Sequence, residues 1–254
     1  MIKRDIILCQ DVDELGRKAT AQFASLADEA VNARGQFNVA LSGGSTPRLL
    51  YSLLASAEFA ARIRWQKVYL FFGDERCVAP DHAESNYRMV KESLLSKILI
   101  PSGNVHRMIG EIEPAIAAAT YETELRQFFS LSQEKLPRFD LILLGLGEDG
   151  HTASLFPHCS ALNETEHLVA TTYVEKLDAH RLTLTFPVIN NAAQITFLIA
   201  GQSKAVVVKE ILGNEAGMAK YPAARIEPHS GKCEWMITAD AAAESVVRKA
   251  TGVR

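Results

Sequence analysis

The feature that most constrains the fold is a series of short apolar runs that stop at glycine. Such runs span Phe37–Leu41, Val68–Phe72, Leu141–Leu144 and 195–200, and a glycine follows each within two residues. An apolar run that ends in this way is typical of a buried strand entering a tight loop. Stretches with the apolar spacing of helices separate the runs. This alternation predicts a mainly parallel sheet with helices on both faces, a Rossmann-like α/β fold.

Helix and strand signals place the other elements. Apolar residues over 11–33 recur at the spacing of one helical face, with Asp11 or Asp13 as the N-cap. Thr46 followed by Pro47 indicates a second helix, capped by Thr46. Further helices are expected from 85 or 86, over 113–129 and 204–212, and from Asp240 onward; further strands are expected over 5–9, 105–108, 167–172, 181–186 and 234–238.

Length and composition limit the class of protein. The chain has 254 residues and no convincing linker, so we expect a single domain over 1–254, with 155–190 as a less regular, β-rich layer. A net charge of −3 argues against nucleic acid or a membrane surface as the main partner. The N-terminus lacks the long apolar region of a signal peptide. The four cysteines are scattered, which indicates reduced thiols and a cytoplasmic protein.

The loop after Leu141–Leu144 carries three groups that can move protons, Glu148, Asp149 and His151. Its glycines at 145, 147 and 150 match the dinucleotide-binding pattern GxGxxG. Two carboxylates before the third glycine disfavour a bound pyrophosphate, and no acidic residue ends a strand roughly 20 residues later. A plain glycine turn would leave the Glu-Asp-Gly-His cluster unexplained. Residues 152–156 are expected to begin a helix.

Two other strand ends carry polar groups. Ser42-Gly-Gly-Ser-Thr46 lies between a strand and a helix N-terminus, where backbone N–H groups and the helix dipole favour an anion. The GK[ST] ending of a Walker loop is absent, and a tight turn without a ligand is the alternative. Asp74, Glu75 and Arg76 follow the strand Val68–Phe72, either as a site or as a solvated charged loop.

The carboxyl ends of parallel strands meet at one edge of a sheet, so these groups are expected to converge. Lys204 follows a further strand, and Arg181 begins another. The ligand that best fits hydroxyls, amides and cations is a small phosphorylated molecule, with proton transfer or water activation by His151 as the chemistry. The seven histidines show no HxxxH or HExxH spacing, so no protein-bound metal is expected.

Together these motifs resemble the 6-phosphogluconolactonases, whose superfamily also contains glucosamine-6-phosphate deaminase. The resemblance covers nearly the whole chain, in order. The motifs that carry it are Leu41-Ser-Gly-Gly-Ser-Thr-Pro47, Phe72-Gly-Asp-Glu-Arg76 with Ser85-Asn86-Tyr87, Gly145-Leu-Gly-Glu-Asp-Gly-His-Thr-Ala-Ser-Leu-Phe-Pro157, and Arg181-Leu-Thr-Leu-Thr185.

The resemblance implies hydrolysis of 6-phospho-D-glucono-1,5-lactone to 6-phosphogluconate in the pentose phosphate pathway, with a phosphorylated sugar lactone as the partner and no metal or cofactor. It implies that His151 is the general base, that Asp149 orients the histidine or the substrate, and that Arg76 binds substrate or stabilises developing charge. The residues that it implies for binding of substrate or phosphate are Ser42, Gly43, Gly44, Ser45, Thr46, Asp74, Arg181 and Lys204.

Two alternatives remain. The deaminase follows its Asp-Gly-His with Phe-Asn-Glu-Pro, and its Glu serves the histidine; this chain has Ser154-Leu-Phe-Pro157, without a carboxylate. Asp74 would be the proton shuttle of a deaminase. Arg76 and Ser85-Asn86 match the lactonase pattern instead. The second alternative is a sugar-phosphate sensor without turnover. Such a protein could lose His151, so the retained Asp149, His151 and Arg76 favour an enzyme. No helix-turn-helix segment or basic patch points to a regulator.

Overall fold

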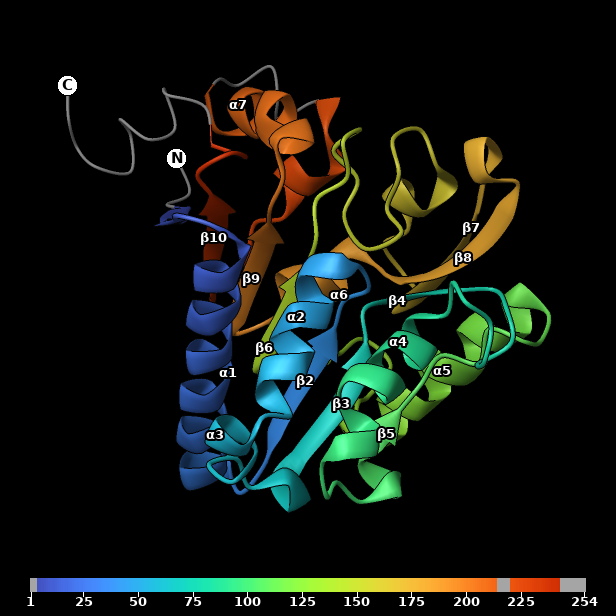
Figure 1. The fold of residues 1–254 in the computed structure, drawn as a ribbon. Coiled ribbons are helices and arrows are strands. Elements are labelled where there is room, and N and C mark those ends of the chain that lie inside the picture. The colour runs from blue at the N-terminus through green and yellow to red at the C-terminus, as the bar shows by residue number, and fades with distance from the viewer. Residues whose placement is uncertain (1–3, 214–219, 243–254) are drawn as a thin grey trace.

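A seven-stranded parallel sheet forms the centre of the molecule in the computed structural model, which describes residues 4–213 and 220–242 (Figure 1). Every neighbouring pair in this sheet is parallel. The strands, in spatial order, are β1 (Asp5–Cys9), β10 (Lys232–Thr238), β9 (Gln194–Ile199), β6 (Leu141–Leu144), β2 (Phe37–Leu41), β3 (Val68–Phe72) and β5 (Val105–His106). The predicted α/β class with a parallel sheet is therefore confirmed.

Helices surround this sheet, and α1, α2 and α3 lie in front of it in Figure 1. The helices are α1 (Val12–Arg34), α2 (Ser45–Leu54), α3 (Ala57–Ala60), α4 (Asn86–Ser93), α5 (Pro114–Phe128), α6 (Phe186–Asn190) and α7 (Ala205–Gly213), with single 3-10 turns η1 (Trp65–Lys67), η2 (Leu95–Lys97), η3 (Ser102–Asn104), η4 (Ser160–Asn163), η5 (Glu175–Leu177), η6 (Gln202–Lys204) and η7 (Pro222–Arg225). In the described parts of the chain, no helix combines the length and the apolar character needed to cross a membrane.

The N-cap of α1 is Asp11, whose side chain accepts a hydrogen bond from the N–H of Glu14 at 2.8 Å, as predicted for one of the two candidate aspartates. Gly35 ends the helix at φ 79°. The helix expected from Asp240 onward falls mostly on residues 243–254, which lie outside the described residues; residues 240–242 form a turn.

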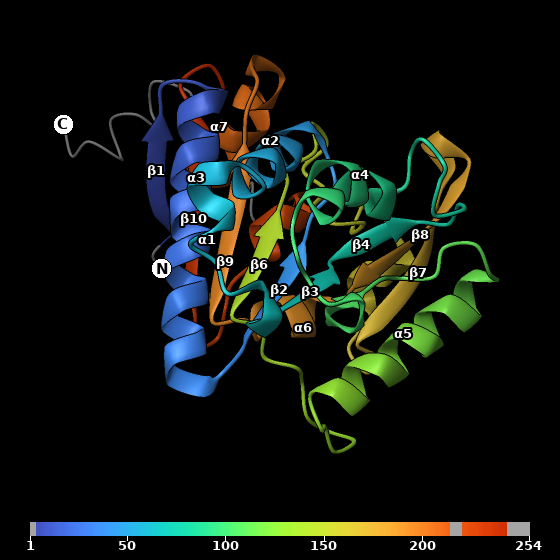
Figure 2. The same cartoon turned by 60° about the horizontal axis from the view of Figure 1, so that its bottom comes forward.

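A second, three-stranded antiparallel sheet lies beside the first. Its order is β4 (Asp74–Arg76), β8 (Ala179–Leu184) and β7 (Val169–Val174), and α5 packs along β7 and β8 (Figure 2). The alternative that residues 74–76 form a solvated charged loop does not hold, because they form strand β4. Only Gly73 separates β3 from β4: its N–H donates to the Leu41 carbonyl and its carbonyl accepts from the Leu184 N–H, each at 2.8 Å. This single residue therefore joins the two sheets.

Two local predictions were wrong. Residues 152–156 begin no helix: Ala153 has φ 48°, and the hydroxyls of Thr152 and Ser154 bond to Gly145 and Asp74 at 2.8 Å instead of capping a turn. Helix α2 is not capped by Thr46, because it begins at Ser45 and its N-cap is Gly44 at φ 109°. This left-handed region favours glycine.

Candidate active site

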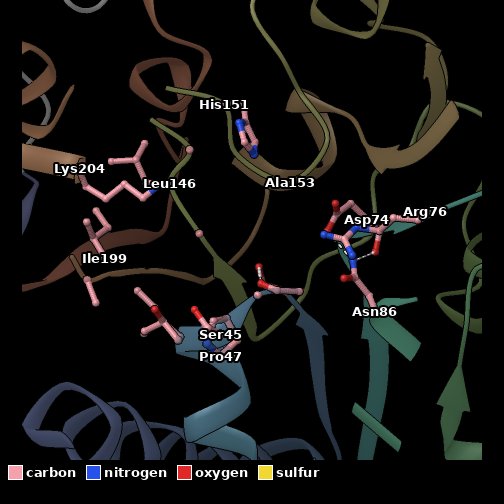
Figure 3. A pocket seen from close by; sticks show the side chains of 18 residues that line it. Ser45, Pro47, Asp74, Arg76, Asn86, Leu146, His151, Ala153, Ile199 and Lys204 are labelled. Carbon is pink, nitrogen blue, oxygen red and sulfur yellow. Dashed lines mark hydrogen bonds between the residues drawn. The ribbon is translucent and has the colours of Figure 1, made fainter. Parts of the chain in front are cut away.

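The predicted strand ends do converge. One pocket, with a volume of about 280 Å³, lies at the carboxyl ends of the parallel strands. Nine of the predicted site residues line it: Ser42, Gly43, Gly44, Ser45, Thr46, Asp74, Arg76, His151 and Lys204. In Figure 3, Lys204 and Arg76 lie on opposite sides of the pocket, with His151 between them at one end and Ser45 at the other. The arrangement offers cations, backbone N–H groups and one imidazole to a single small ligand.

The anion loop, residues 42–46, begins helix α2. A buried tyrosine fixes its first residue: the Ser42 N–H donates to the Tyr51 hydroxyl at 3.0 Å, and that hydroxyl donates to the Ser42 carbonyl at 2.8 Å. Burial raises the pKa of Tyr51, so the phenol stays a donor. A Cβ at Gly43 would lie 1.9 Å from Asn86 Oδ1, so this close approach requires glycine. The N-terminus of a ten-residue helix thus faces the pocket, as an anion site requires.

Lys204 supplies the cation on the side of β9. It ends the 3-10 turn η6, which follows β9 after Gly201. Its Nζ lies 3.7 Å from Oε1 of Glu148, whose side chain is largely exposed. A hydrogen bond from Ser203 and the charge of Lys204 lower the pKa of Glu148. Glu148 therefore acts as the counter-ion of Lys204 at the rim of the pocket.

His151 and Asp149 form a hydrogen-bonded pair, with Nδ1 and Oδ1 2.5 Å apart. The other carboxylate oxygen, Oδ2, accepts from Lys176. Burial alone would raise the pKa of Asp149, but the hydrogen bonds from His151 and Lys176 outweigh it and hold that pKa well below its usual range. Because Nδ1 is hydrogen-bonded to the Asp149 carboxylate, a neutral imidazole carries its proton on Nδ1. Nε2 is then the nitrogen that can accept a proton. Asp149 lies behind the histidine and does not line the pocket.

On the opposite wall, Asp74 is held by two side chains. Its Oδ1 accepts from Asn86 Nδ2 at 3.2 Å and its Oδ2 accepts from Ser154 Oγ at 2.8 Å. Asn86 also lines the pocket and was not predicted as a site residue, although the Ser85-Asn86-Tyr87 motif marked its position. The Arg76 guanidinium donates to the Glu84 carbonyl, its one hydrogen-bond acceptor in the described part of the chain.

Glu75 does not line the pocket, because alternate residues of a strand face opposite sides. Its carboxylate is buried and accepts from the backbone N–H groups of Arg76, Asn86 and Tyr87 at 2.7–2.8 Å. Burial raises its pKa and outweighs these hydrogen bonds, which favour the charged form. Glu75 therefore anchors the start of α4.

Arg181 pairs with Arg76 in the register of β4 and β8 and is buried. Its guanidinium donates to the His180 carbonyl at 3.1 Å and does not line the pocket. Burial, followed by the charge of Arg76, lowers its pKa. Its predicted contact with phosphate stays a prediction. The described residues contain no cluster of His, Cys, Asp or Glu placed to hold a metal ion.

Comparison with known proteins places this site in a family. The model of the family described as glucosamine-6-phosphate isomerases/6-phosphogluconolactonase matches residues 10–235. The chain belongs to this family. The family contains enzymes of two kinds, so the match leaves the choice between them to the site and to the individual relatives.

Within the family, similar relatives carry the name 6-phosphogluconolactonase. The protein from Synechocystis is 45% identical over 210 residues, which cover 82% of this chain and 85% of the relative. The protein from Haemophilus influenzae is 40% identical over 200 residues, which cover 79% of this chain and 84% of the relative. The structure of 6-phosphogluconolactonase from Trypanosoma cruzi superposes with a TM-score of 0.84 at 28% identity, over 94% of this chain and 96% of that one. A monomeric glucosamine-6-phosphate deaminase, at 22% identity and a TM-score of 0.76, shares the fold.

Proposed function

We propose that the chain is a cytoplasmic enzyme that hydrolyses 6-phospho-D-glucono-1,5-lactone to 6-phosphogluconate in the pentose phosphate pathway. The observation that carries the proposal is the placement of His151, whose Nδ1 is held by Asp149, in the same pocket as the anion loop and Lys204. The names of the similar relatives support the same activity. The four cysteines, all free thiols, support the cytoplasmic assignment.

The phosphate of the substrate binds at the N-terminus of α2, where the backbone N–H groups of the anion loop and the Lys204 ammonium face it. This contact lies away from the reacting carbon and holds the sugar ring in one orientation. Binding energy from the phosphate thereby lowers the entropic cost of bringing the lactone carbonyl to the base.

His151 is the general base of the hydrolysis. Nε2 takes a proton from a water molecule as the water oxygen bonds to the lactone carbonyl carbon, and the carbonyl electron pair moves onto its oxygen. The tetrahedral intermediate then expels the ring oxygen, which takes the proton back from the imidazolium. Asp149 acts through the histidine as a positioning residue, since its carboxylate holds Nδ1 and stabilises the imidazolium.

Arg76 stabilises the oxyanion of the intermediate. Its guanidinium carries five N–H donors, and the only acceptor described for it in this structure is the Glu84 carbonyl, so donors remain for the substrate. A well-placed donor to an oxyanion contributes roughly 3–4 kcal/mol in the transition state.

A second activity, deamination of glucosamine 6-phosphate, is favoured by Asp74, which lines the pocket where a deaminase would need a proton shuttle. Phe156 argues against it. This residue precedes Pro157 and so stands where the deaminase motif has its Glu. The Phe156 ring stacks on His151 with centroids 4.1 Å apart, so an apolar ring occupies the place of the carboxylate that would serve the histidine.

The test is the initial rate of hydrolysis of the lactone, made in situ, with the spontaneous rate subtracted and a chelator present. We expect rapid turnover by the wild type and a loss of about 10²-fold or more in His151→Ala, because the base is removed. His167→Ala is the control, since His167 is exposed and outside the pocket.

A wild type no faster than the spontaneous reaction would overturn the proposal. Turnover of glucosamine 6-phosphate under the same conditions would establish the deaminase instead. Binding of 6-phosphogluconate without turnover of either substrate would establish a sensor.

A further inference from the structure

A third charged group lies against the His151–Asp149 pair from outside the pocket. Lys176 stands in the turn η5, which joins β7 to β8, and its ammonium bonds to Oδ2 of Asp149. The imidazole is bonded to the other oxygen, Oδ1. The carboxylate is therefore held at both oxygens, by a histidine on the pocket side and a lysine on the far side.

Phe156 connects the same two side chains by a second route. The Lys176 ammonium lies 4.9 Å from the centroid of the Phe156 ring, within the range of a cation–π contact. The Phe156 ring stacks on the imidazole of His151, with centroids 4.1 Å apart and 27° between the ring planes. Lys176 thus contacts both neighbours of the histidine, although 27 residues separate it from Asp149 in the sequence.

The turn that carries Lys176 is fixed by its own residues. Asp178 has φ 47°, and its N–H donates to the Glu175 carbonyl at 3.1 Å. The Tyr173 hydroxyl donates to the Asp178 carboxylate and closes the hairpin from the other side. The backbone is therefore held in place, and this limits where the half-exposed Lys176 side chain can reach.

We propose that Lys176 is a positioning residue that holds Asp149 against His151 and keeps the imidazole in its neutral form, in which it can act as a base. This rests on the proposed role of His151 in the hydrolysis. Nothing in the sequence motifs pointed to Lys176, because it lies outside all of them.

The electrostatic reason is the balance of charge on Asp149. With Lys176 present, the negative charge of the carboxylate is shared between an ammonium and the imidazole. The carboxylate therefore stabilises the protonated imidazole less. When an uncharged side chain replaces Lys176, the carboxylate charge of Asp149 acts on the imidazolium alone. The replacement therefore favours protonation of His151. Other charged groups line the same pocket as the histidine, Asp74 and Arg76 from β4 and Lys204 from η6. Glu148 stands in the loop of the histidine and Glu175 beside Lys176 in η5, and the replacement leaves all of these groups unchanged.

The experiment compares Lys176→Met, which keeps the length without the charge, with Lys176→Arg, which restores the charge. Lys18→Met is the matched control, because Lys18 pairs with Glu14 on α1, away from the pocket. The first measurement needs no substrate: the rate at which diethyl pyrocarbonate modifies His151, located by peptide mass spectrometry, as a function of pH. Only the neutral imidazole reacts.

The second measurement is the pH profile of kcat/KM for the lactone. In Lys176→Met we expect the acid limb of both profiles to move to higher pH by about half a unit to one unit. At a given pH on that limb, the modification rate and kcat/KM should each fall about 3- to 10-fold. Lys176→Arg and Lys18→Met should match the wild type.

An acid limb that stays in place, or moves to lower pH, in Lys176→Met would overturn the proposal, since a lysine that only stabilises the hairpin would not shift it upward. The modification rate separates this failure from failure of the proposed function. If the wild type has no lactonase activity, the substrate-free profile still decides whether Lys176 controls the charge of His151.

Discussion

In the proposed mechanism, Lys204 supplies the side-chain charge that binds the substrate phosphate. It lines the pocket, and its one described ionic partner is the exposed Glu148 at 3.7 Å, a distance at which the pair is weak. A phosphate in the anion loop would offer the ammonium a stronger partner. The contact acts on binding rather than on the reacting bond, so its loss should appear mainly in KM.

For Lys204→Met we therefore expect KM for the lactone to rise about 10- to 100-fold with kcat changed much less, the effect of losing one charge-assisted hydrogen bond. Steady-state kinetics of the wild type and the variant check this. Lys220→Met is the control, because Lys220 pairs with Glu210 outside the pocket. An unchanged KM would remove Lys204 from the phosphate site.

The position of a residue in the pocket was predictable where a motif and a strand end coincided, as for Ser42, His151 and Lys204. The sequence could not show which of two neighbouring charges faces the pocket. Arg76 lines the pocket, whereas Arg181, its partner in the register of β4 and β8, is buried and does not line it. Paired residues point to the same face of a sheet, so the difference lies in where each long side chain reaches, and no local pattern encodes this. Lys176 reaches Asp149 only through a tertiary contact between two loops.

Among the elements, helix α4 depends on a carboxylate from another strand. Glu75 of β4 accepts from the N–H groups of Asn86 and Tyr87 at the start of this helix. Burial raises the pKa of Glu75, so the folded state favours the protonated carboxyl more than the unfolded state does. The stability that this group contributes is therefore complete at low pH and is lost as the pH rises through the raised pKa.

The variant Glu75→Gln should lower the free energy of unfolding, because the amide nitrogen of glutamine, unlike a carboxyl oxygen, cannot accept a hydrogen bond from a backbone N–H group. The side chain of the variant does not titrate. The difference from the wild type should thus be larger near pH 4.5 than near pH 7.5, as measured by urea unfolding at about these two values. A difference that grows with pH would mean that Glu75 is stabilised as the anion in the folded state.

Element boundaries were predictable where a residue acts locally. Asp11 caps α1 and Glu113 caps α5 through their own side chains. The prediction of a helix start was wrong at residues 152–156, where the hydroxyls of Thr152 and Ser154 bond to distant groups. Residues 74–76, for which a solvated loop was one alternative, pair with β8 instead. In both cases tertiary pairing overrides the local pattern.

For the whole molecule, the two sheets share one continuous cluster of buried residues, which includes Leu182 and Leu184 of β8 and Leu141–Leu144 of β6. The single domain over 1–254 stays a prediction, and this core supports it. Strands β8 and β6 each have a neighbour on both sides in their sheets. If the two sheets unfold together, the backbone amides of these strands should exchange with free energies of opening that agree to within about 1 kcal/mol.

Native-state hydrogen exchange measures these free energies, with the edge strand β5 as an internal reference that should exchange faster. Opening of β8 at a free energy lower than that of β6 by more than about 2 kcal/mol would show that the smaller sheet is a separate unit.

Gly73 also limits how such a chain can change in length. It is the only residue between β3 and β4, and its two backbone hydrogen bonds reach Leu41 and Leu184. Insertion of one residue here would exchange the two faces of β4, so that Glu75 would point into the pocket in place of Asp74 and Arg76. Residues 81–84, a few positions later, are exposed and can absorb an insertion without this effect. Variation in length among functional homologues should therefore occur in the later loop and be absent at the glycine.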